Sequence, residues 1–153
     1  MRIEFTVYGD AKPAGSKRAF AIRRGGIPTG QVAVSDANPK AKAWKQEVSA
    51  AAFKACWDAQ DCPLDGPLRV SMRFFRLRPK SHYGANGLNR KGRESVAPTS
   101  KPDVLKLARG VEDAMTGIVY RDDSQIVAEL LSKDWGEPAR VEITIECLGS
   151  HDA

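Results

Sequence analysis

KPDVLKLARGVEDAMTG, residues 101–117, says most about the fold of this sequence, and IVYRDDSQI, residues 118–126, follows it directly. Val104, Leu107, Val111 and Met115 recur at the three- and four-residue spacing of an amphipathic helix. Gly117 is a natural stop, because glycine readily takes the left-handed conformation that ends many helices. We therefore predict a helix over residues 103–116 with one apolar face.

Segments on both sides of this helix have their own periodicity. Asn38 and Pro39 form a good helix start, and the residues after them predict a helix over 39–58 with Trp44 in the core. Alternation of apolar and polar residues predicts strands over 3–7, 68–74, 125–132 and 139–148. The prediction is an α/β (α+β) fold: a single domain, 1–153, with a small mixed sheet of about four strands and two main helices.

Two long segments lack such periodicity. Residues 9–37 are rich in Gly, Lys and Arg and predict a loop, with a short hairpin as the alternative. Residues 78–102 are long for a structureless connection, and such segments are usually functional or mobile. His82 and Tyr83 lie in the second segment. They are candidates for stacking on an unpaired base, with packing on their own domain as the alternative.

The composition is that of a globular protein, with 42% hydrophobic and 28% charged residues among 153. No apolar run approaches the roughly 18 residues that span a bilayer, and the N-terminus lacks the apolar block of a signal peptide. Cys56, Cys62 and Cys147 fit neither a disulfide framework nor a zinc site. We expect free thiols in a reducing cytoplasm.

The charge is divided unevenly along the chain. Residues 1–102 hold 19 Lys and Arg against 8 Asp and Glu, and residues 103–153 hold 5 against 11. The basic part indicates a polyanionic partner. An acidic part beside it suits a phosphate ligand only if a divalent cation lies between the two.

Two acidic positions are candidates for holding such a cation. Asp103 opens the predicted helix, and Asp122 and Asp123 precede the strand that follows it. Consecutive elements with a short connection usually pack together, so we expect Asp103 and Asp123 to converge. Carboxylates at one point need a counter-charge, for which Mg²⁺ or Mn²⁺ is the natural choice. Ser100 with Asp103 is alternatively a capping box, and the acidic pair an ordinary polar turn.

The same stretch resembles the signature of the RusA family of Holliday junction resolvases, most closely the branch found in phages and prophages. The residues that carry the resemblance are KPD at 101–103, Leu107, Arg109, DAMTG at 113–117, YRDDSQI at 120–126 and Lys133. Weaker similarity runs through residues 12–18, Trp44 and residues 78–82. The resemblance implies a RusA-like homodimer that binds four-way DNA junctions and nicks two strands symmetrically with Mg²⁺, in DNA recombination and repair.

The family's site residues are carried over position by position. The resemblance implies Asp103 and Asp123 as catalytic residues and metal ligands, with Asp122 as a further ligand. Arg109 stands where the family has a catalytic lysine; it keeps the positive charge but is not an equivalent donor or base. The resemblance implies no organic cofactor and no membrane partner. It implies the cytoplasm of a bacterial or phage-infected cell as the location.

This sequence departs from the family at Leu105, where a second carboxylate is usual. On a helix, Leu105 shares a face with Arg109 and Glu112 rather than with the apolar stripe. Asp122 or Glu112 is a candidate to compensate for the missing ligand. The alternative function is therefore a catalytically weak or silent protein that binds junction DNA.

The basic residues suggest how DNA would be held. Affinity that depends on phosphate contacts falls steeply with salt, and Lys101 lies close enough to Asp103 to hold a phosphate there. A metal-dependent phosphohydrolase of small substrates is a third hypothesis, disfavoured by the extended basic surface. The candidate DNA-binding residues are Lys12, Lys17, Arg18, Arg23, Arg24, Arg78, Lys80, Arg90, Lys91, Arg93, Lys101 and Lys133.

Overall fold

A four-stranded sheet forms the centre of the computed structural model, which describes residues 1–14, 17–36 and 39–149. Its strands are β1 (Arg2–Tyr8), β8 (Arg140–Cys147), β4 (Leu68–Arg76) and β7 (Ile126–Trp135), in that order across the sheet. β8 pairs antiparallel with β1 and β4, whereas β4 and β7 run parallel. The predicted α+β fold with a mixed sheet of four strands is therefore confirmed.

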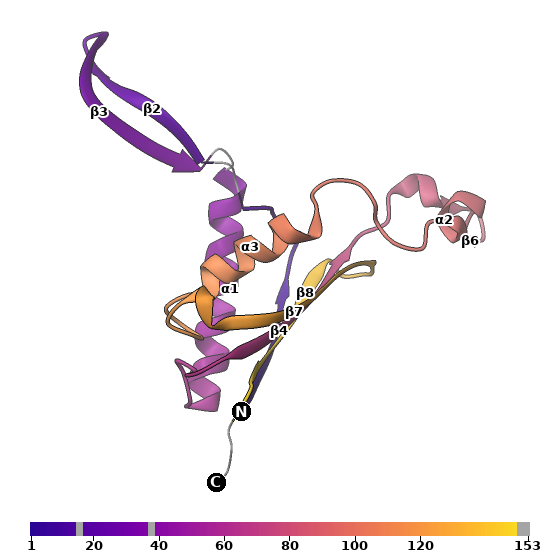
Figure 1. Ribbon diagram of the computed structural model, residues 1–153. Coiled ribbons are helices and arrows are strands. Elements are labelled where there is room, and N and C mark those ends of the chain that lie inside the picture. Colours follow the sequence, from indigo (N-terminus) through magenta and orange to yellow (C-terminus); the bar gives the residue numbers. More distant parts are fainter. Residues whose placement is uncertain (15–16, 37–38, 150–153) are drawn as a thin grey trace.

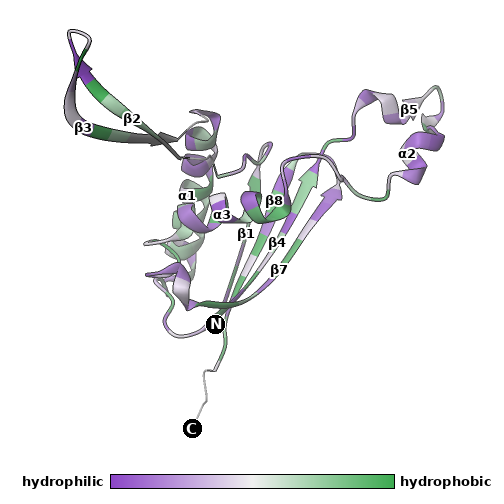
Figure 2. Ribbon diagram, turned by 45° about the horizontal axis from the view of Figure 1, so that its top comes forward, coloured by the Kyte–Doolittle hydropathy of each residue, from purple (hydrophilic) through white to green (hydrophobic). Residues whose placement is uncertain are grey.

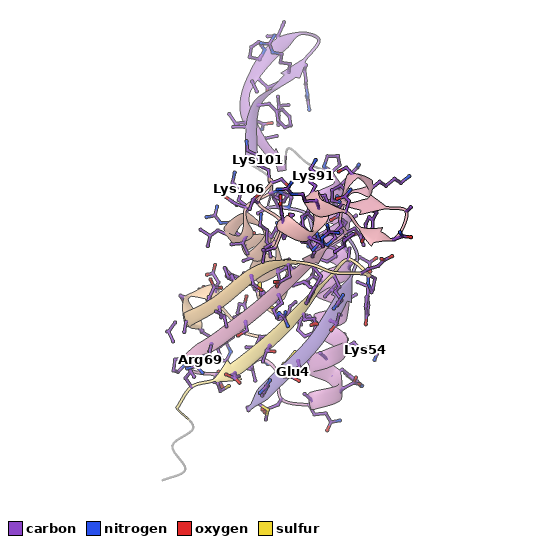
Figure 3. All side chains as sticks on the ribbon, turned by 90° about the vertical axis from the view of Figure 1, so that its right-hand side faces the viewer. Glu4, Lys54, Arg69, Lys91, Lys101 and Lys106 are labelled. Carbon is purple, nitrogen blue, oxygen red and sulfur yellow. A yellow bond between two sulfur atoms is a disulfide. The ribbon has the colours of Figure 1, made fainter. Side chains whose placement is uncertain are left out.

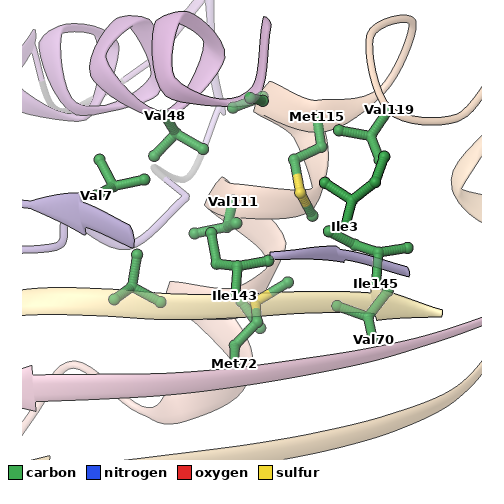
Figure 4. Close-up of a cluster of buried hydrophobic side chains, with 14 of the residues drawn as sticks. Ile3, Val7, Val48, Val70, Met72, Val111, Met115, Val119, Ile143 and Ile145 are labelled. Carbon is green, nitrogen blue, oxygen red and sulfur yellow. The ribbon is translucent and has the colours of Figure 1, made fainter. Parts of the chain in front are cut away.

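Two helices cover one face of this sheet, as Figure 1 shows. They are α1 (Pro39–Ala59) and α3 (Val104–Met115), which agree closely with the predicted helices. The inward side chains of the strands, among them Val70, Met72 and Ile143, pack against Val48 of α1 and Val111 of α3 (Figure 4). Trp44 is buried in the same core, as predicted. The predicted cap Asn38 lies outside the described residues.

The other face of the sheet is polar. Arg69 pairs with Glu146 and Arg73 with Asp134 across neighbouring strands. Figure 3 looks onto this side of the sheet, where side chains such as Glu4 and Arg69 project from the strands. Alternation of inward apolar and outward polar residues explains why the strands could be predicted from the sequence.

Residues 9–37 form more than a loop. β2 (Lys17–Arg24) and β3 (Ile27–Asp36) pair antiparallel as a hairpin that projects away from the body of the molecule (Figure 1). The hairpin alternative of the sequence analysis is the one that the structure adopts. Gly25 and Gly26 form its turn with positive φ of 55° and 80°, a conformation that favours glycine.

Residues 77–100 form a small lobe at the end of the sheet. It contains the 3-10 turn η1 (Lys80–His82), the short strands β5 (Tyr83–Gly84) and β6 (Gly87–Leu88), and the helix α2 (Arg90–Glu94). Figure 2 shows that α2 is strongly hydrophilic. His82 is buried against Trp135, with the ring centres 5.4 Å apart. Stacking of His82 on a base is therefore ruled out by its burial, whereas Tyr83 is 48% exposed.

The prediction of three free thiols is wrong for one pair. Cys56 and Cys62 form a disulfide with Cα atoms 5.4 Å apart. α1 ends at Ala59, and Gln60 turns the chain with a φ of 55°, which returns Cys62 to the last turns of the helix. Cys147 is free, as predicted.

The burial of α3 generates a test with a matched control on the same helix. Leu107 is fully buried, whereas Leu105 is 65% exposed. We expect Leu107→Ala to lower the free energy of unfolding by about 2–5 kcal/mol because it leaves a cavity. Leu105→Ala should change it by less than about 0.5 kcal/mol. Urea unfolding followed by circular dichroism measures both, and equal losses would contradict this packing of α3.

Candidate active site

Asp103 begins α3 as its N-cap. Its side chain accepts a hydrogen bond from the backbone N–H of Lys106 at 3.0 Å, which satisfies one free donor at the helix start. The N-cap is therefore Asp103. The capping-box alternative, which made Ser100 the N-cap, is wrong. One Asp103 oxygen is used for this bond, and the side chain is exposed.

The segment after α3 is held by polar contacts with the helix and with the loop before β4. The Tyr120 hydroxyl donates to the Glu112 carbonyl at 2.9 Å. The Gln125 side chain donates to the carbonyls of Leu64 and Gly66 at 3.0 and 3.1 Å. These bonds fix the short turn η2 (Asp123–Gln125) beside the C-terminal half of α3.

Asp122 is the N-cap of η2 and accepts a hydrogen bond from the Ser124 backbone N–H at 2.8 Å. The backbone and side-chain hydrogen bonds of Ser124 lower the pKa of Asp122. Asp122 therefore stays ionised, but its first role in this structure is to shape the turn that presents Asp123.

Carboxylates gather where η2 meets α3 and the start of β7. Glu112 extends from α3 toward Glu129 of β7 and hydrogen-bonds it, with Asp123 and Asp113 also acting on its charge. Burial, the Glu129 hydrogen bond and these negative charges raise the pKa of Glu112 to about 8. At neutral pH Glu112 therefore keeps its proton. A recess of about 330 Å³ is lined by Glu112, Asp123, Ile126, Val127, Ala128 and Glu129.

The expected convergence of Asp103 and Asp123 does not occur within one copy of the chain. Lys133, near the end of β7, donates to the carbonyl of Pro102 just before α3, at 3.1 Å. Glu112, late in α3, contacts Glu129, early in β7. α3 thus runs antiparallel to β7, and Asp103 lies about 14 Å from Glu112 along the helix axis, at 1.5 Å per residue.

The acidic recess is an incomplete metal site as it stands. No group of three acidic, His or Cys side chains in residues 1–14, 17–36 and 39–149 is close enough to hold an ion. Glu112 was a candidate from the sequence through its shared face with Leu105. Glu129 was missed, because it lies on the helix-covered face of the sheet, beside buried Val70, where a strand pattern predicts an apolar residue.

The stripe formed by Leu105, Arg109 and Glu112 lies on the side of α3 turned away from the core. Leu105 and Arg109 are exposed and Glu112 is half-buried. The expected face-sharing of these three residues is thus confirmed. Arg109 lies between the helix start at Asp103 and the acidic recess.

The predicted DNA-binding residues fall into two groups. Several carry structural contacts: Lys12 pairs with Asp10 at 2.9 Å, Arg78 donates to the Gly92 carbonyl at 2.6 Å, and Lys133 holds the loop before α3. Arg90 pairs with Glu94 at 2.8 Å while staying exposed.

A second group is exposed on the two parts that project from the body. Arg23 and Arg24 lie near the hairpin tip, Lys80 and Lys91 on the lobe, and Lys101 before α3. Figure 3 places Lys91 and Lys101 on the half of the molecule from which the lobe and hairpin extend. Arg93 of the lobe is exposed and donates to the Leu88 carbonyl at 2.6 Å. The side chains of Lys17 and Arg18 lie outside the described residues.

Comparison with known proteins places these features in a family. The family described as "Endodeoxyribonuclease RusA" matches residues 10–146. A relative from Bacillus subtilis (strain 168), named "Uncharacterized protein YqaN", is 35% identical over 144 residues, which cover 94% of each chain. None of the helices in the described residues has the length and apolar character needed to cross a membrane.

The raised pKa of Glu112 generates a test in metal-free buffer. In the unfolded chain Glu112 loses its proton near its ordinary value of 4.5, and in the folded protein near 8. Wild-type stability should therefore fall as pH rises between these values and level off above them. Glu112→Gln keeps the hydrogen bond without the charge. From pH 5 to pH 8 it should gain about 1–2 kcal/mol relative to wild type, discounted for partial exposure.

Urea unfolding at several pH values with a chelator present measures this difference. Glu47→Gln, an exposed carboxylate on α1, is the matched control and should follow the wild-type pH dependence. Parallel stability curves for wild type and Glu112→Gln would show that Glu112 is not the group that holds the proton.

Proposed function

This chain belongs to the RusA family of endodeoxyribonucleases, and on that premise we propose that it resolves four-way DNA junctions by paired, symmetric nicks. The reaction depends on Mg²⁺ or Mn²⁺ and serves DNA recombination and repair. The acting form is a homodimer, because symmetric incision of a two-fold junction needs two sites related by a two-fold axis. The observation that carries this proposal is the family match over residues 10–146.

The acidic recess is the best-supported position for the divalent cation. Carboxylate oxygens are the ligands that Mg²⁺ and Mn²⁺ prefer. Glu112, Glu129 and Asp123 line the recess from three adjacent elements and would have to draw closer together to bind one ion. The raised pKa of Glu112 reflects the crowding of negative charge in the recess, which a divalent cation would neutralise. When bound, the cation would polarise the phosphodiester and lower the pKa of an attacking water.

The other predicted site residues have roles along the same face of α3. Arg109 would hold a phosphate between the helix start and the recess, because its guanidinium is always charged and suited to phosphate. Asp122 remains a proposed ligand next to Asp123, whereas Asp103 lies too far along α3 to bind the same cation; both side chains cap the start of an element. The exposed lysines and arginines of the hairpin and lobe would bind the phosphates of the junction arms.

A catalytically weak or silent junction-binding protein is the alternative function. Leu105 supports it, because an exposed leucine stands one turn before Arg109 where the family usually has a carboxylate. Such a protein would keep the basic surface and bind junctions in preference to linear duplex, without nicking them.

The nuclease proposal is tested by incubating the protein with a synthetic four-way junction and Mg²⁺. We expect paired nicks, and a loss of about 100-fold or more in nicking rate in Asp123→Asn, because removing even an outer-shell partner of a metal commonly costs 10- to 100-fold. Asp58→Asn, on the exposed side of α1, should cut like wild type. Sequencing gels resolve the positions and symmetry of the nicks.

Two outcomes would change the proposal. No nicking with any of several divalent cations, together with tight junction binding, would favour the silent alternative. Full activity of Asp123→Asn beside an inactive Asp103→Asn would move the site from the acidic recess to the start of α3.

Leu105→Asp separates the two functions. If the missing carboxylate limits catalysis, this variant should nick junctions about 10-fold or more faster than wild type at equal Mg²⁺, by the usual effect of a metal-site group. Leu105→Asn has similar size and polarity without the charge, and it should show no gain. Unchanged rates in both variants would mean that Leu105 is not a catalytic defect.

A further inference from the structure

A second recess lies under the lobe, away from the carboxylates of the acidic recess. It measures about 420 Å³, in the size range of small-ligand sites, and is lined by Leu77, Arg78, Tyr83, Trp135, Gly136 and Glu137. The residues come from the lobe, from the last residue of β7 and from the connection after it. We call it the lobe recess.

The back wall of the lobe recess is held rigidly. The Trp135 indole N–H donates to the carbonyl and the hydroxyl of Ser95, at 3.1 and 3.2 Å. The Arg78 guanidinium lies 5.4 Å from the centre of the Trp135 ring and donates to the Gly92 carbonyl. His82 packs edge-on against the same ring. These contacts fix the position of the Trp135 ring in the wall of the recess.

Two lining groups are left available for a ligand. Tyr83 is 48% exposed, and its backbone is held by pairing with Leu88. Glu137 is exposed in the connection between β7 and β8. The recess thus offers an aromatic face, a guanidinium plane and a carboxylate acceptor, which are the groups that stack on a planar ring and accept a hydrogen bond from an amino group.

Charge around the lobe recess selects the ligand class. Two aromatic rings with a carboxylate could bind a cation, but the Arg78 guanidinium already lies over Trp135. Lys80 and Lys91 are exposed on the same lobe, and Lys91 is near enough to act with Arg78 on the charge of His82. These cations repel a positively charged ligand and attract a planar ligand that carries phosphates.

We propose that the lobe recess binds an unpaired nucleobase of the DNA. The base stacks on Tyr83 beside the Arg78 guanidinium, Glu137 accepts a hydrogen bond from its exocyclic amino group, and lobe lysines hold the flanking phosphates. This inference rests on the proposed action on branched DNA and adds to it a feature that is recognised: a base that leaves its stack at the branch.

The experiment uses a four-way junction with one extruded 2-aminopurine at the branch, and a fully paired junction of the same arms. With a chelator present to prevent cutting, wild type should bind the extruded form more tightly. It should also quench the 2-aminopurine emission, because the base becomes stacked. Tyr83→Ala should weaken binding of the extruded form by roughly 5- to 100-fold, the usual effect of removing a stacking ring, and leave the emission bright.

Two control variants make the result specific. Tyr83→Phe keeps the ring and should behave as wild type. Phe53→Ala removes an exposed aromatic on α1 and should also behave as wild type. Tyr83 is exposed, so its replacement should leave the thermal unfolding midpoint within a few degrees of wild type.

The outcomes distinguish this inference from the proposed function. Equal binding of both junctions by wild type and Tyr83→Ala, with unquenched emission, would overturn the lobe recess as a base site while leaving junction binding intact. Failure of wild type to bind either junction would instead overturn the proposed function, and the inference with it.

Discussion

The contact between α3 and β7 is the constraint on which the rest of this structure depends. Leu107, Val111 and Met115 are fully buried on the inner face of α3. This apolar packing fixes the helix on the sheet whichever charged residues lie on its outer face. Glu112 is therefore held beside Glu129 although like charges repel. Burial and the neighbouring acids raise the pKa of Glu112, so this carboxyl keeps its proton in neutral solution.

Polar contacts at each end secure the antiparallel arrangement of α3 and β7. At one end the Lys133 ammonium donates to the carbonyls of Ser100 and Pro102. At the other, the Tyr120 hydroxyl donates to the Glu112 carbonyl. The Lys133 bonds satisfy backbone oxygens in the loop before α3, and the Tyr120 bond adds to the one that the Glu112 carbonyl accepts from the Thr116 backbone N–H. The positions of the acidic recess and of Asp103 are thus both fixed by the same pair of elements.

Elements with a repeating apolar pattern could be predicted from the sequence, whereas features that depend on contacts between distant residues could not. The strands and both helices were predictable because apolar residues recur at fixed spacings. The convergence of Asp103 and Asp123 was not, because periodicity does not reveal that α3 crosses β7 antiparallel, which separates the starts of two consecutive elements. The lobe was missed because it depends on Trp135, 40 residues from Ser95, and the disulfide because only the turn after α1 brings Cys62 back.

The proton that Glu112 keeps at neutral pH lowers the negative charge that the acidic recess presents to DNA. Two ionised carboxylates would repel a DNA strand, whereas a pair that holds one proton repels it less. Arg109 lies on the same face, and no ion pair links it to Glu112 in the described part of the chain, so its charge is available for a phosphate. On the proposed function, Glu112, Glu129 and Asp123 would hold a divalent cation, which would supply the positive charge that a phosphate needs beside these acids. Binding of the cation would then depend on pH through Glu112, because the ligand must lose its proton first.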